Sequence, residues 1–326
     1  MSKPLVKTEN LKKYFPVTRG ISLFSRVKKF VHAVDGVSFK INKGETFGLI
    51  GESGCGKTTV ARLVLRLLEP TNGTVYFESQ NIFELNKREM RKLRRDMQIV
   101  FQDPTASLNP RMIIEEIIGE PLRNTFGNQP DNREKVAKVM ERVGLYPAQQ
   151  FFRRYPHEFS VGQRQRIAIA RALITKPKFV VADEPVSSLD MSVKSQILNS
   201  MRELKEEYDL TYLLIAHDLA VVRYMCDWIA IMYLGRIVES APAKLFFTSL
   251  HPYTRALISA FPVPDPDVKR ERITLKGEVP SPIELPQGCK FNPRCPYREP
   301  ECAKLEPKLT EVREQHYVAC HKYSYG

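Results

Sequence analysis

The sequence predicts an α/β fold built on a central, largely parallel sheet, and two observations support this. Residues 46–50, 178–184 and 211–216 are short apolar runs of strand length. The second run is unbroken until two acids end it, which is typical of a strand buried on both faces of a parallel sheet. Helical patterns at residues 59–65 and 112–158 separate these runs. We therefore expect strands and helices to alternate around one sheet.

The length and composition are those of an ordinary globular protein. The chain has 326 residues, enough for one large domain and a smaller one, and is 43% hydrophobic and 27% charged. No apolar run approaches the length that spans a bilayer, and the N-terminus lacks the apolar segment of a signal peptide. We expect a soluble protein of the cytosol.

The net charge of +13 leaves three kinds of partner open: nucleic acid, an anionic membrane surface, or none in particular. Basic residues cluster at 26–29 and 91–95. Neither cluster carries the interleaved aromatic side chains of a single-strand binder. We favour a solvated surface that can face a membrane over nucleic-acid binding.

The N-terminal segments 5–11 and 37–41 alternate apolar and polar residues, as half-buried strands do. The polar and basic residues 18–29 between them predict a surface loop. Tyr14 precedes this loop, where its ring can stack on a purine or serve as an ordinary strand tyrosine.

A glycine-rich loop follows the first apolar run and fits the phosphate-binding pattern G-x-x-x-x-G-K-[ST]. Because glycine has no side chain, backbone N–H groups can close around phosphate oxygens at the start of the next helix. We expect Lys57 to reach the β- and γ-phosphates, Thr58 to hold Mg²⁺ and Thr59 to lie near the α-phosphate. The alternative is a chance glycine-rich turn, which the flanking strand and helix disfavour. The predicted nucleotide-binding residues of the loop are Gly51, Glu52, Ser53, Gly54, Cys55, Gly56, Lys57, Thr58 and Thr59.

Four polar side chains directly follow other predicted strands: Gln102, Asp183, Glu184 and His217. Oxygen ligands suit Mg²⁺, so we expect Gln102 and Asp183 to hold this ion together with Thr58. Glu184 can polarise an attacking water, and His217 can contact a γ-phosphate. The pattern predicts phosphoryl transfer, against the alternative of surface residues that happen to end strands.

A second helix N-terminus follows the helical stretch at residues 112–158. It begins at Ser160, Val161, Gly162 and Gln163 and is able to bind an anion. The phosphate loop does not need such a site within the same chain. It becomes useful if it serves the nucleotide of another subunit.

The composition changes near residue 241, beyond which prolines are frequent and helical patterning fades. Before this point, residues 228–239 predict a hairpin that turns at Gly235 and Arg236. After it, one more helix opens at His251. We place a domain boundary near residue 245, which gives domains 1–245 and 246–326, with a helical subdomain at about residues 103–165.

Four of the six cysteines lie in the C-terminal extension, at Cys289, Cys295, Cys302 and Cys320. In a cytosolic chain such a cluster favours metal binding over disulfides. The spacing C-x5-C-x6-C-x17-C matches neither a zinc ribbon nor the common ferredoxins. An iron–sulfur cluster, zinc and unligated thiols therefore all stay open.

Over nearly the whole chain, these motifs resemble those of an ATP-binding-cassette (ABC) ATPase. Residues 51–58 match Walker A and residues 179–183 match Walker B, while Tyr14 falls where the family stacks adenine. In this resemblance Glu184 corresponds to the catalytic glutamate, Gln102 to the Q-loop and His217 to the switch histidine. The family implies a RecA-like P-loop core, an antiparallel β subdomain and an all-helical subdomain.

Two further segments extend the resemblance. Residues 159–163 are similar to the signature L-S-G-G-Q, which they match at Ser160, Gly162 and Gln163 and from which they depart at Phe159 and Val161. The family implies that the signature of one chain acts on the ATP of its partner. The segment similar to the D-loop is Ser188, Leu189 and Asp190.

Residues 101–104, 107–110 and 251–253, with the extension, look like the ATPase subunits of oligopeptide and dipeptide importers, whose relatives also import nickel or oligosaccharides. The resemblance implies ATP and Mg²⁺ as cofactors, and a [4Fe–4S] cluster on the four cysteines, with zinc as the alternative. It implies a paralogous ATPase partner that closes head to tail with this chain, or a homodimer in isolation. It also implies two membrane permease subunits, an extracellular solute-binding protein as an indirect partner, no nucleic acid, and a peripheral place on the cytoplasmic face of the membrane.

Two other functions compete with import. A soluble ABC ATPase acting on nucleic acid would account for the +13 charge, but such proteins often carry two cassettes or a long coiled-coil insert, and neither occurs here. A regulatory cassette without hydrolysis is favoured by Val161 and disfavoured by Glu184 and His217. The transported solute is not encoded in this chain.

Overall fold

The structure is a computed structural model that describes residues 3–17, 29–260 and 272–323. The predicted loop at residues 18–29 lies outside this part, except for Lys29. The strands are β1 (Val6–Val17), β2 (Lys29–Ile41), β3 (Thr46–Ile50), β4 (Asn72–Phe77), β5 (Gln80–Asn81), β6 (Met97–Val100), β7 (Phe179–Asp183), β8 (Thr211–Ala216), β9 (Trp228–Tyr233), β10 (Arg236–Pro242), β11 (Thr310–Arg313) and β12 (His316–Val318). The α-helices are α1 (Lys57–Val64), α2 (Lys87–Leu93), α3 (Pro104–Ser107), α4 (Ile114–Phe126), α5 (Asn132–Arg142), α6 (Val161–Leu173), α7 (Met191–Tyr208), α8 (Leu219–Met225) and α9 (Pro252–Ser259). Short 3-10 turns are η1 (Ala148–Gln150), η2 (Pro156–Glu158), η3 (Ala243–Thr248), η4 (Pro300–Ala303) and η5 (His321–Tyr323).

The central sheet has the strand order β11-β12-β10-β9-β3-β8-β7-β6. Strands β9, β3, β8, β7 and β6 run parallel, and β10, β12 and β11 add antiparallel strands at one edge. Every residue of β3, β7 and β8 is buried, because helices and the second sheet cover both faces. The predicted α/β fold is confirmed. In parallel neighbours the C-terminal ends meet at one edge, so the residues after β3, β6, β7 and β8 come together there.

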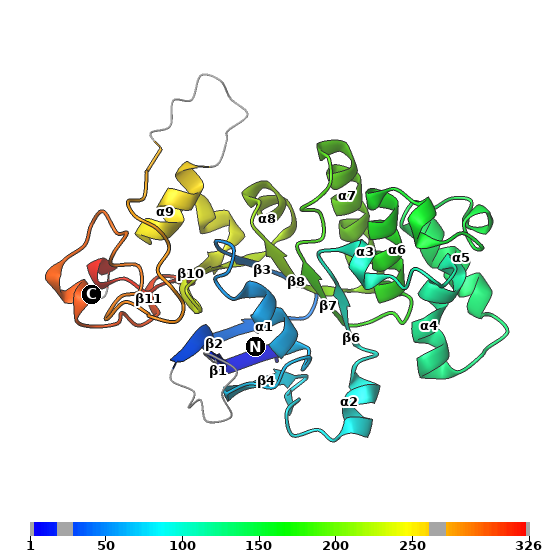
Figure 1. Cartoon of the computed structure of the whole chain (residues 1–326), viewed down its shortest axis with the longest axis horizontal. Coiled ribbons are helices and arrows are strands. Elements are labelled where there is room, and N and C mark those ends of the chain that lie inside the picture. Colours follow the sequence, from blue (N-terminus) through cyan, green and yellow to red (C-terminus); the bar gives the residue numbers. More distant parts are fainter. Residues whose placement is uncertain (1–2, 18–28, 261–271, 324–326) are drawn as a thin grey trace.

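A second, antiparallel sheet has the order β2-β1-β4-β5 (Figure 1). It packs through Val34 and Val37 of β2 on Val60 and Leu63 of α1 in one buried cluster. Strands β1 and β2 are longer than the alternating segments predict, because the pairing continues to Val17↔Lys29. This sheet therefore lies directly beside the helix that leaves the phosphate loop.

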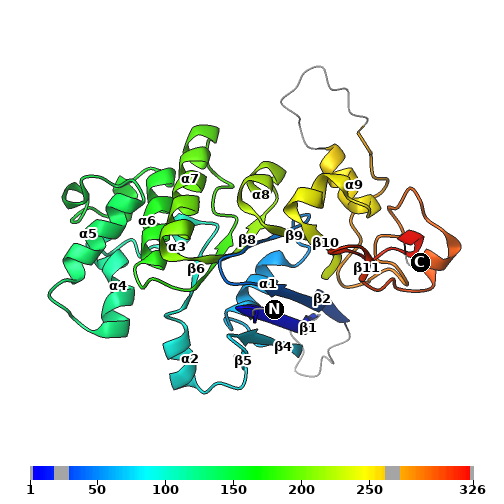
Figure 2. The same ribbon diagram turned by 180° about the vertical axis from the view of Figure 1, so that it is seen from behind.

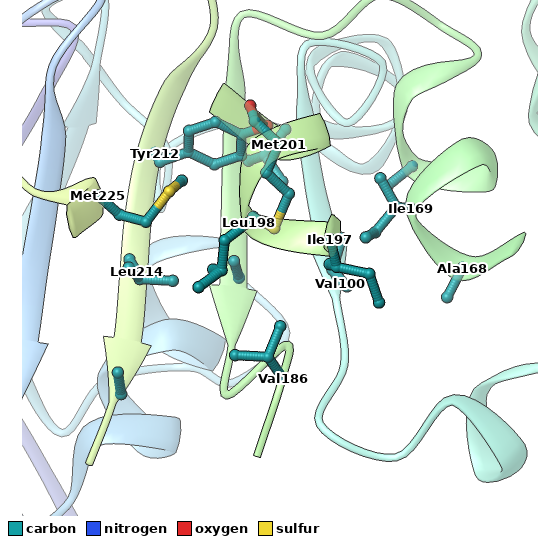
Figure 3. Close-up of a cluster of buried hydrophobic side chains, with 14 of the residues drawn as sticks. Val100, Ala168, Ile169, Val186, Ile197, Leu198, Met201, Tyr212, Leu214 and Met225 are labelled. Atoms are coloured by element: carbon teal, nitrogen blue, oxygen red, sulfur yellow. Dashed lines mark hydrogen bonds between the residues drawn. The ribbon is translucent and has the colours of Figure 1, made fainter. Parts of the chain in front are cut away.

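The helical part, with α3 to α6, lies at one end of the molecule, and the extension lies at the other (Figures 1 and 2). A buried cluster joins the helices to the central sheet; Figure 3 shows Met201 of α7 beside Tyr212 of β8, and Ile197 of α7 beside Val100 of β6. Residues 112–158 are less helical than the sequence predicts. After α5 the chain forms only η1 and η2, because Gly144 takes a positive φ of 80° that ends the helix.

The extension also differs from its prediction, since it contributes strands to the central sheet. Glu239↔Val318 and Ser240↔Tyr317 pair β10 with β12. The buried Glu239 carboxylate contacts His316 Nε2 at 2.6 Å and accepts the Leu250 backbone N–H at 2.8 Å. The hairpin before it turns at Leu234–Gly235, one residue earlier than expected, because Arg236 already pairs with Tyr233.

Within the described ranges, no helix is long and apolar enough to cross a membrane.

Candidate active site

The phosphate loop lies between β3 and α1, and close contacts require two of its glycines. A Cβ on Gly51 would lie 2.2 Å from the Met232 carbonyl oxygen of β9. Gly56 has a φ of +109°, and its Cβ would lie 2.0 Å from the Ala33 carbonyl oxygen of β2. A side chain at either position would push a strand away from the loop.

Lys57 lies inside the loop with its amine buried. Its Nζ donates to the carbonyl oxygens of Gly51 at 2.7 Å and of Glu52 at 3.0 Å. Two backbone carbonyl oxygens of the loop therefore hold the amine at the N-terminus of α1. An anion placed there meets both the ammonium charge and the helix dipole.

Asp183 at the end of β7 accepts a hydrogen bond from the Thr58 hydroxyl at 3.2 Å. Burial raises the pKa of Asp183, and the bond from Thr58 opposes this only in part. A divalent cation at this point would favour the ionised carboxylate. The hydroxyl and carboxylate oxygens are hard ligands of the kind that Mg²⁺ takes, so the two residues fit the ion.

Glu184 follows Asp183 and contacts two other strand-end residues. Its Oε2 accepts the Gln102 Nε2 at 3.0 Å and lies 3.1 Å from His217 Nδ1. With loop residues 53–54 and 56–59, these three side chains line a depression of about 420 Å³. The structure thus brings together the predicted residues from four separate strand ends. Gln102 contacts Glu184 here, and Thr58 contacts Asp183.

Tyr14 lies on β1 opposite His32 of β2, and their ring centroids are 4.3 Å apart. Ala33, which follows His32 on β2, lies against Gly56 of the phosphate loop. The Tyr14 ring therefore lies on the strand pair that borders this loop. Its hydroxyl donates to Asp35 Oδ1 at 2.5 Å. Burial and this hydrogen bond raise the pKa of Tyr14 to about 12.

Asp35 is a charged residue that the sequence analysis missed. Its Oδ2 pairs with Lys290 at 2.6 Å and with Arg236 at 3.0 Å. Burial would raise its pKa, but hydrogen bonds from Lys290 and Tyr14 and the charge of Arg236 outweigh burial and hold the pKa of Asp35 well below its usual range. Asp35 therefore joins the Tyr14 hydroxyl on β1 to Lys290 of the extension.

We predict that Asp35→Asn lowers the free energy of unfolding at neutral pH by about 3–5 kcal/mol, because Lys290 is left buried without its carboxylate. The folded pKa is depressed, so the stabilisation is present above the unfolded pKa of about 4 and is lost as pH falls toward the folded pKa. Urea unfolding followed by the fluorescence of Trp228, at pH 7 and between pH 5 and 3, measures both effects.

The matched control is Asp209→Asn, which removes an exposed ion pair with Lys43. Such a pair contributes about 0–1 kcal/mol. An Asp35→Asn variant as stable as this control, with the same acid dependence, would contradict the prediction.

Three more contacts to the phosphate loop come from the extension and were missed by the sequence. Arg294 forms two bonds to the Glu52 carboxylate, at 2.9 and 3.2 Å, and the Tyr253 hydroxyl accepts the Glu52 backbone N–H at 3.0 Å. Glu52 and Arg294 are 242 positions apart. No local pattern signals a pairing over that separation.

The signature segment begins α6. Ser160 Oγ accepts the Gln163 N–H at 3.2 Å, and Gln163 Oε1 accepts the Ser160 N–H at 3.0 Å, which is a capping box. Val161 between them is 39% exposed. Among the described residues that line the depression at the phosphate loop, none comes from 160–163. The phosphate loop and the N-terminus of α6 thus do not share a depression within one chain.

The D-loop segment has a structural role as well. Asp190 caps α7 by accepting the Val193 N–H at 3.0 Å, after Ser188 and Leu189. Val193 also lies against the signature, since a Cβ on Gly162 would be 2.6 Å from its Cγ1. The signature therefore packs against the first turn of the helix that Asp190 caps.

The four cysteines of the extension line one small cavity, together with His251 and His321. Burial raises the pKa of Cys289 to about 12 and that of Cys320 to about 11. In the described part of the chain, however, no group of three or more His, Cys, Asp or Glu side chains is arranged to hold a metal ion. The thiols share a cavity without forming the closed metal site that the sequence predicts.

A phosphate loop, an acidic strand end, a second antiparallel sheet and a separate helical part define an ATPase of the cassette type. The family model described as "ABC transporter" matches residues 34–187, and the one described as "Oligopeptide/dipeptide transporter, C-terminal region" matches residues 238–302. The chain belongs to the ABC transporter ATPase family and carries the C-terminal region of its oligopeptide/dipeptide branch.

Relatives support this over the full length. The chain is 50% identical to the oligopeptide transport ATP-binding protein AppF of Bacillus subtilis, covering 98% of both chains. It is 49% identical to the dipeptide transport ATP-binding protein DppF of Haemophilus influenzae, covering 97% of this chain and 96% of the relative.

Solved structures show the same fold. The ATP-binding cassette MJ0796, a dimer in a post-hydrolysis state with ADP and phosphate, has a TM-score of 0.64 and 28% identity, over 73% of this chain and 98% of its own. The cassette cbiO1 of Clostridium perfringens has a TM-score of 0.64 and 27% identity, over 76% and 92%.

Proposed function

We propose that this chain hydrolyses ATP to power the import of dipeptides, oligopeptides or related solutes. The observation that carries the proposal is the complete phosphate loop beside the cluster of Glu184, Gln102 and His217, in a chain that matches peptide transport ATP-binding proteins end to end. These relatives give no support to a nucleic-acid function.

ATP lies with its phosphates in the loop, from Gly51 to Thr59, and its adenine against Tyr14. Lys57 neutralises the β- and γ-phosphates. Mg²⁺ held by Thr58, Asp183 and Gln102 would spread the charge of the phosphates. Glu184 orients and polarises the attacking water, and His217 contacts the γ-phosphate from the adjacent strand end.

The second ATP-binding surface comes from another subunit. Because the signature and the loop remain apart in one chain, two chains close head to tail, and Ser160 and Gly162 of one complete the ATP site of the other. We propose a paralogous ATPase as the partner, or a second copy in isolation. Two permease subunits place the pair at the cytoplasmic face of the membrane, and an extracellular solute-binding protein delivers the solute.

Co-expression with the permease subunits tests this function. We expect the chain to co-purify with them, and vesicles containing the complex to accumulate peptide only with ATP and the solute-binding protein. Failure to co-purify, together with binding to DNA or RNA, would favour the nucleic-acid alternative instead.

We also propose that residues 1–245 form the cassette, with a helical subdomain at about 103–165, and that residues 246–326 form an extension whose four cysteines hold a [4Fe–4S] cluster. The donor set supports this, because all four thiols line one cavity and thiolates are the ligands of such clusters. The group would fix a segment whose described residues, 246–260 and 272–323, form little regular structure. Zinc is the alternative occupant.

We predict that anaerobically purified protein is brown and contains about four iron atoms and four sulfides per chain. Cys295→Ser is expected to lose this iron, whereas Cys226→Ser, which changes a buried thiol in the cassette core, is expected to keep it. Colourless, iron-free protein would exclude the cluster, and one tightly bound zinc per chain would establish the alternative.

A further inference from the structure

The loop between Cys289 and Cys295 carries two cations that reach the ATP site. Arg294 holds the Glu52 carboxylate in a two-bond fork, at 2.9 and 3.2 Å. The Arg294 side chain is 9% exposed and that of Glu52 is 27% exposed, so water screens the pair only in part. Lys290, four residues earlier, is equally buried and pairs with Asp35 at 2.6 Å.

The first of these ion pairs acts on the phosphate side. Glu52 is fixed three times: its side chain by Arg294, its N–H by the Tyr253 hydroxyl, and its carbonyl oxygen by Lys57 Nζ. Two of the three partners belong to the extension. The third is the amine that reaches the phosphates, so a shift of residue 52 moves the Lys57 amine with it.

The second ion pair acts on the adenine side. The Asp35 carboxylate receives Lys290 on Oδ2 and the Tyr14 hydroxyl on Oδ1. The Tyr14 ring is therefore held from its hydroxyl end by a carboxylate that the extension neutralises. Arg236 shares Oδ2 at 3.0 Å, so loss of Lys290 loosens this group without leaving Asp35 unpaired.

We propose that the 289–295 loop positions both ends of the nucleotide: Arg294 aligns the phosphate loop through Glu52, and Lys290 aligns the Tyr14 ring through Asp35. Both are positioning residues, since neither is placed against the nucleotide itself. The inference rests on the proposed ATP site and extends it, because it makes ATP affinity depend on the conformation of the extension. By linkage, bound ATP stabilises that conformation by the same factor.

Calorimetric titration of the full-length chain with ATP tests Arg294. We expect Arg294→Gln to weaken ATP binding about tenfold, within the usual range of coupling between sites. The ATP affinity of Arg294→Lys should lie between those of the parent and Arg294→Gln, because lysine keeps the charge but cannot form two parallel bonds to the carboxylate. Arg298→Gln, an exposed arginine of the same extension, is the matched control and should bind as the parent does. In turnover, Arg294→Gln should raise KM about tenfold and leave kcat within about twofold.

Two ligands, one with and one without adenine, test the roles of Arg294 and Lys290 separately. Titration with tripolyphosphate, which has no adenine, should be weakened by Arg294→Gln and unaffected by Lys290→Met. Titration with ATP should be weakened by both. If Lys290→Met weakened both ligands equally, its assignment to the adenine side would be wrong.

A double-mutant cycle decides whether Arg294 acts through Glu52. The Glu52→Gln, Arg294→Gln double variant should bind ATP no more weakly than Arg294→Gln alone. Fully additive losses, or an Arg294→Gln variant that binds like Arg298→Gln, would overturn the inference. If the parent chain itself failed to bind ATP, the proposed function would be wrong. That result differs from the outcomes above, in which the parent binds ATP and only the positioning roles are refuted.

Discussion

We expect Glu184→Gln to reduce ATP hydrolysis by about 10²–10⁴-fold while ATP still binds. The amide cannot polarise water as a carboxylate does, yet it keeps the shape and one acceptor oxygen for Gln102 and His217. Those two contacts both fall on Oε2, at 3.0 and 3.1 Å, so the other oxygen remains for a water. The phosphate loop makes no hydrogen bond to Glu184 among those of the described residues, which is why binding should survive.

Release of phosphate and calorimetric titration with ATP measure the two effects separately. Glu206→Gln is the matched control, because it makes the same chemical change on an exposed face of α7. That control should hydrolyse ATP like the parent chain. Near-normal turnover in Glu184→Gln would show that Glu184 is not the residue that polarises the water. Loss of ATP binding would show instead that Glu184 supports the phosphate loop.

The central part of this site follows from the sequence because its residues are set by local patterns. The phosphate loop is one contiguous motif, and Gln102, Asp183 and His217 each end an apolar strand. Once the strands are parallel and adjacent, sheet geometry brings their C-terminal ends to one edge without further information. The order β3-β8-β7-β6 meets that condition.

The connection to the extension could not be derived in the same way. Lys290 and Asp35 are 255 positions apart, and each alone reads as a solvated charge. Strand β12 has only three residues, too few for a recognisable alternation, and it exists because β10 offers an open edge. Such features are decided by tertiary packing, and only the folded chain reveals that the extension contacts the phosphate loop.

The second large prediction concerns the head-to-tail closure of two chains around ATP. In a Glu184→Gln background, in which ATP is hardly consumed, we expect ATP to drive the chain into dimers, with itself or with the paralogous ATPase that we propose. Adding Gly162→Asp should weaken this dimer at least about 100-fold, a loss of roughly 2.7 kcal/mol. The new carboxylate would stand at the N-terminus of α6, where the γ-phosphate of the partner's ATP is expected, and the like charges repel.

Light scattering with and without ATP measures the dimer, and calorimetry measures nucleotide binding by the monomer. Because the depression at the phosphate loop is lined by none of the described residues 160–163, Gly162→Asp should leave monomer binding unchanged. Gly162→Ala brings the same 2.6 Å contact of Cβ with Val193 but no carboxylate, so the difference between the two variants reports the added carboxylate. If the aspartate variant dimerised as well as the alanine variant, the signature would not face the partner's phosphates. The phosphate loop and the N-terminus of α6 would then need separate explanations, since neither could complete a site with the other.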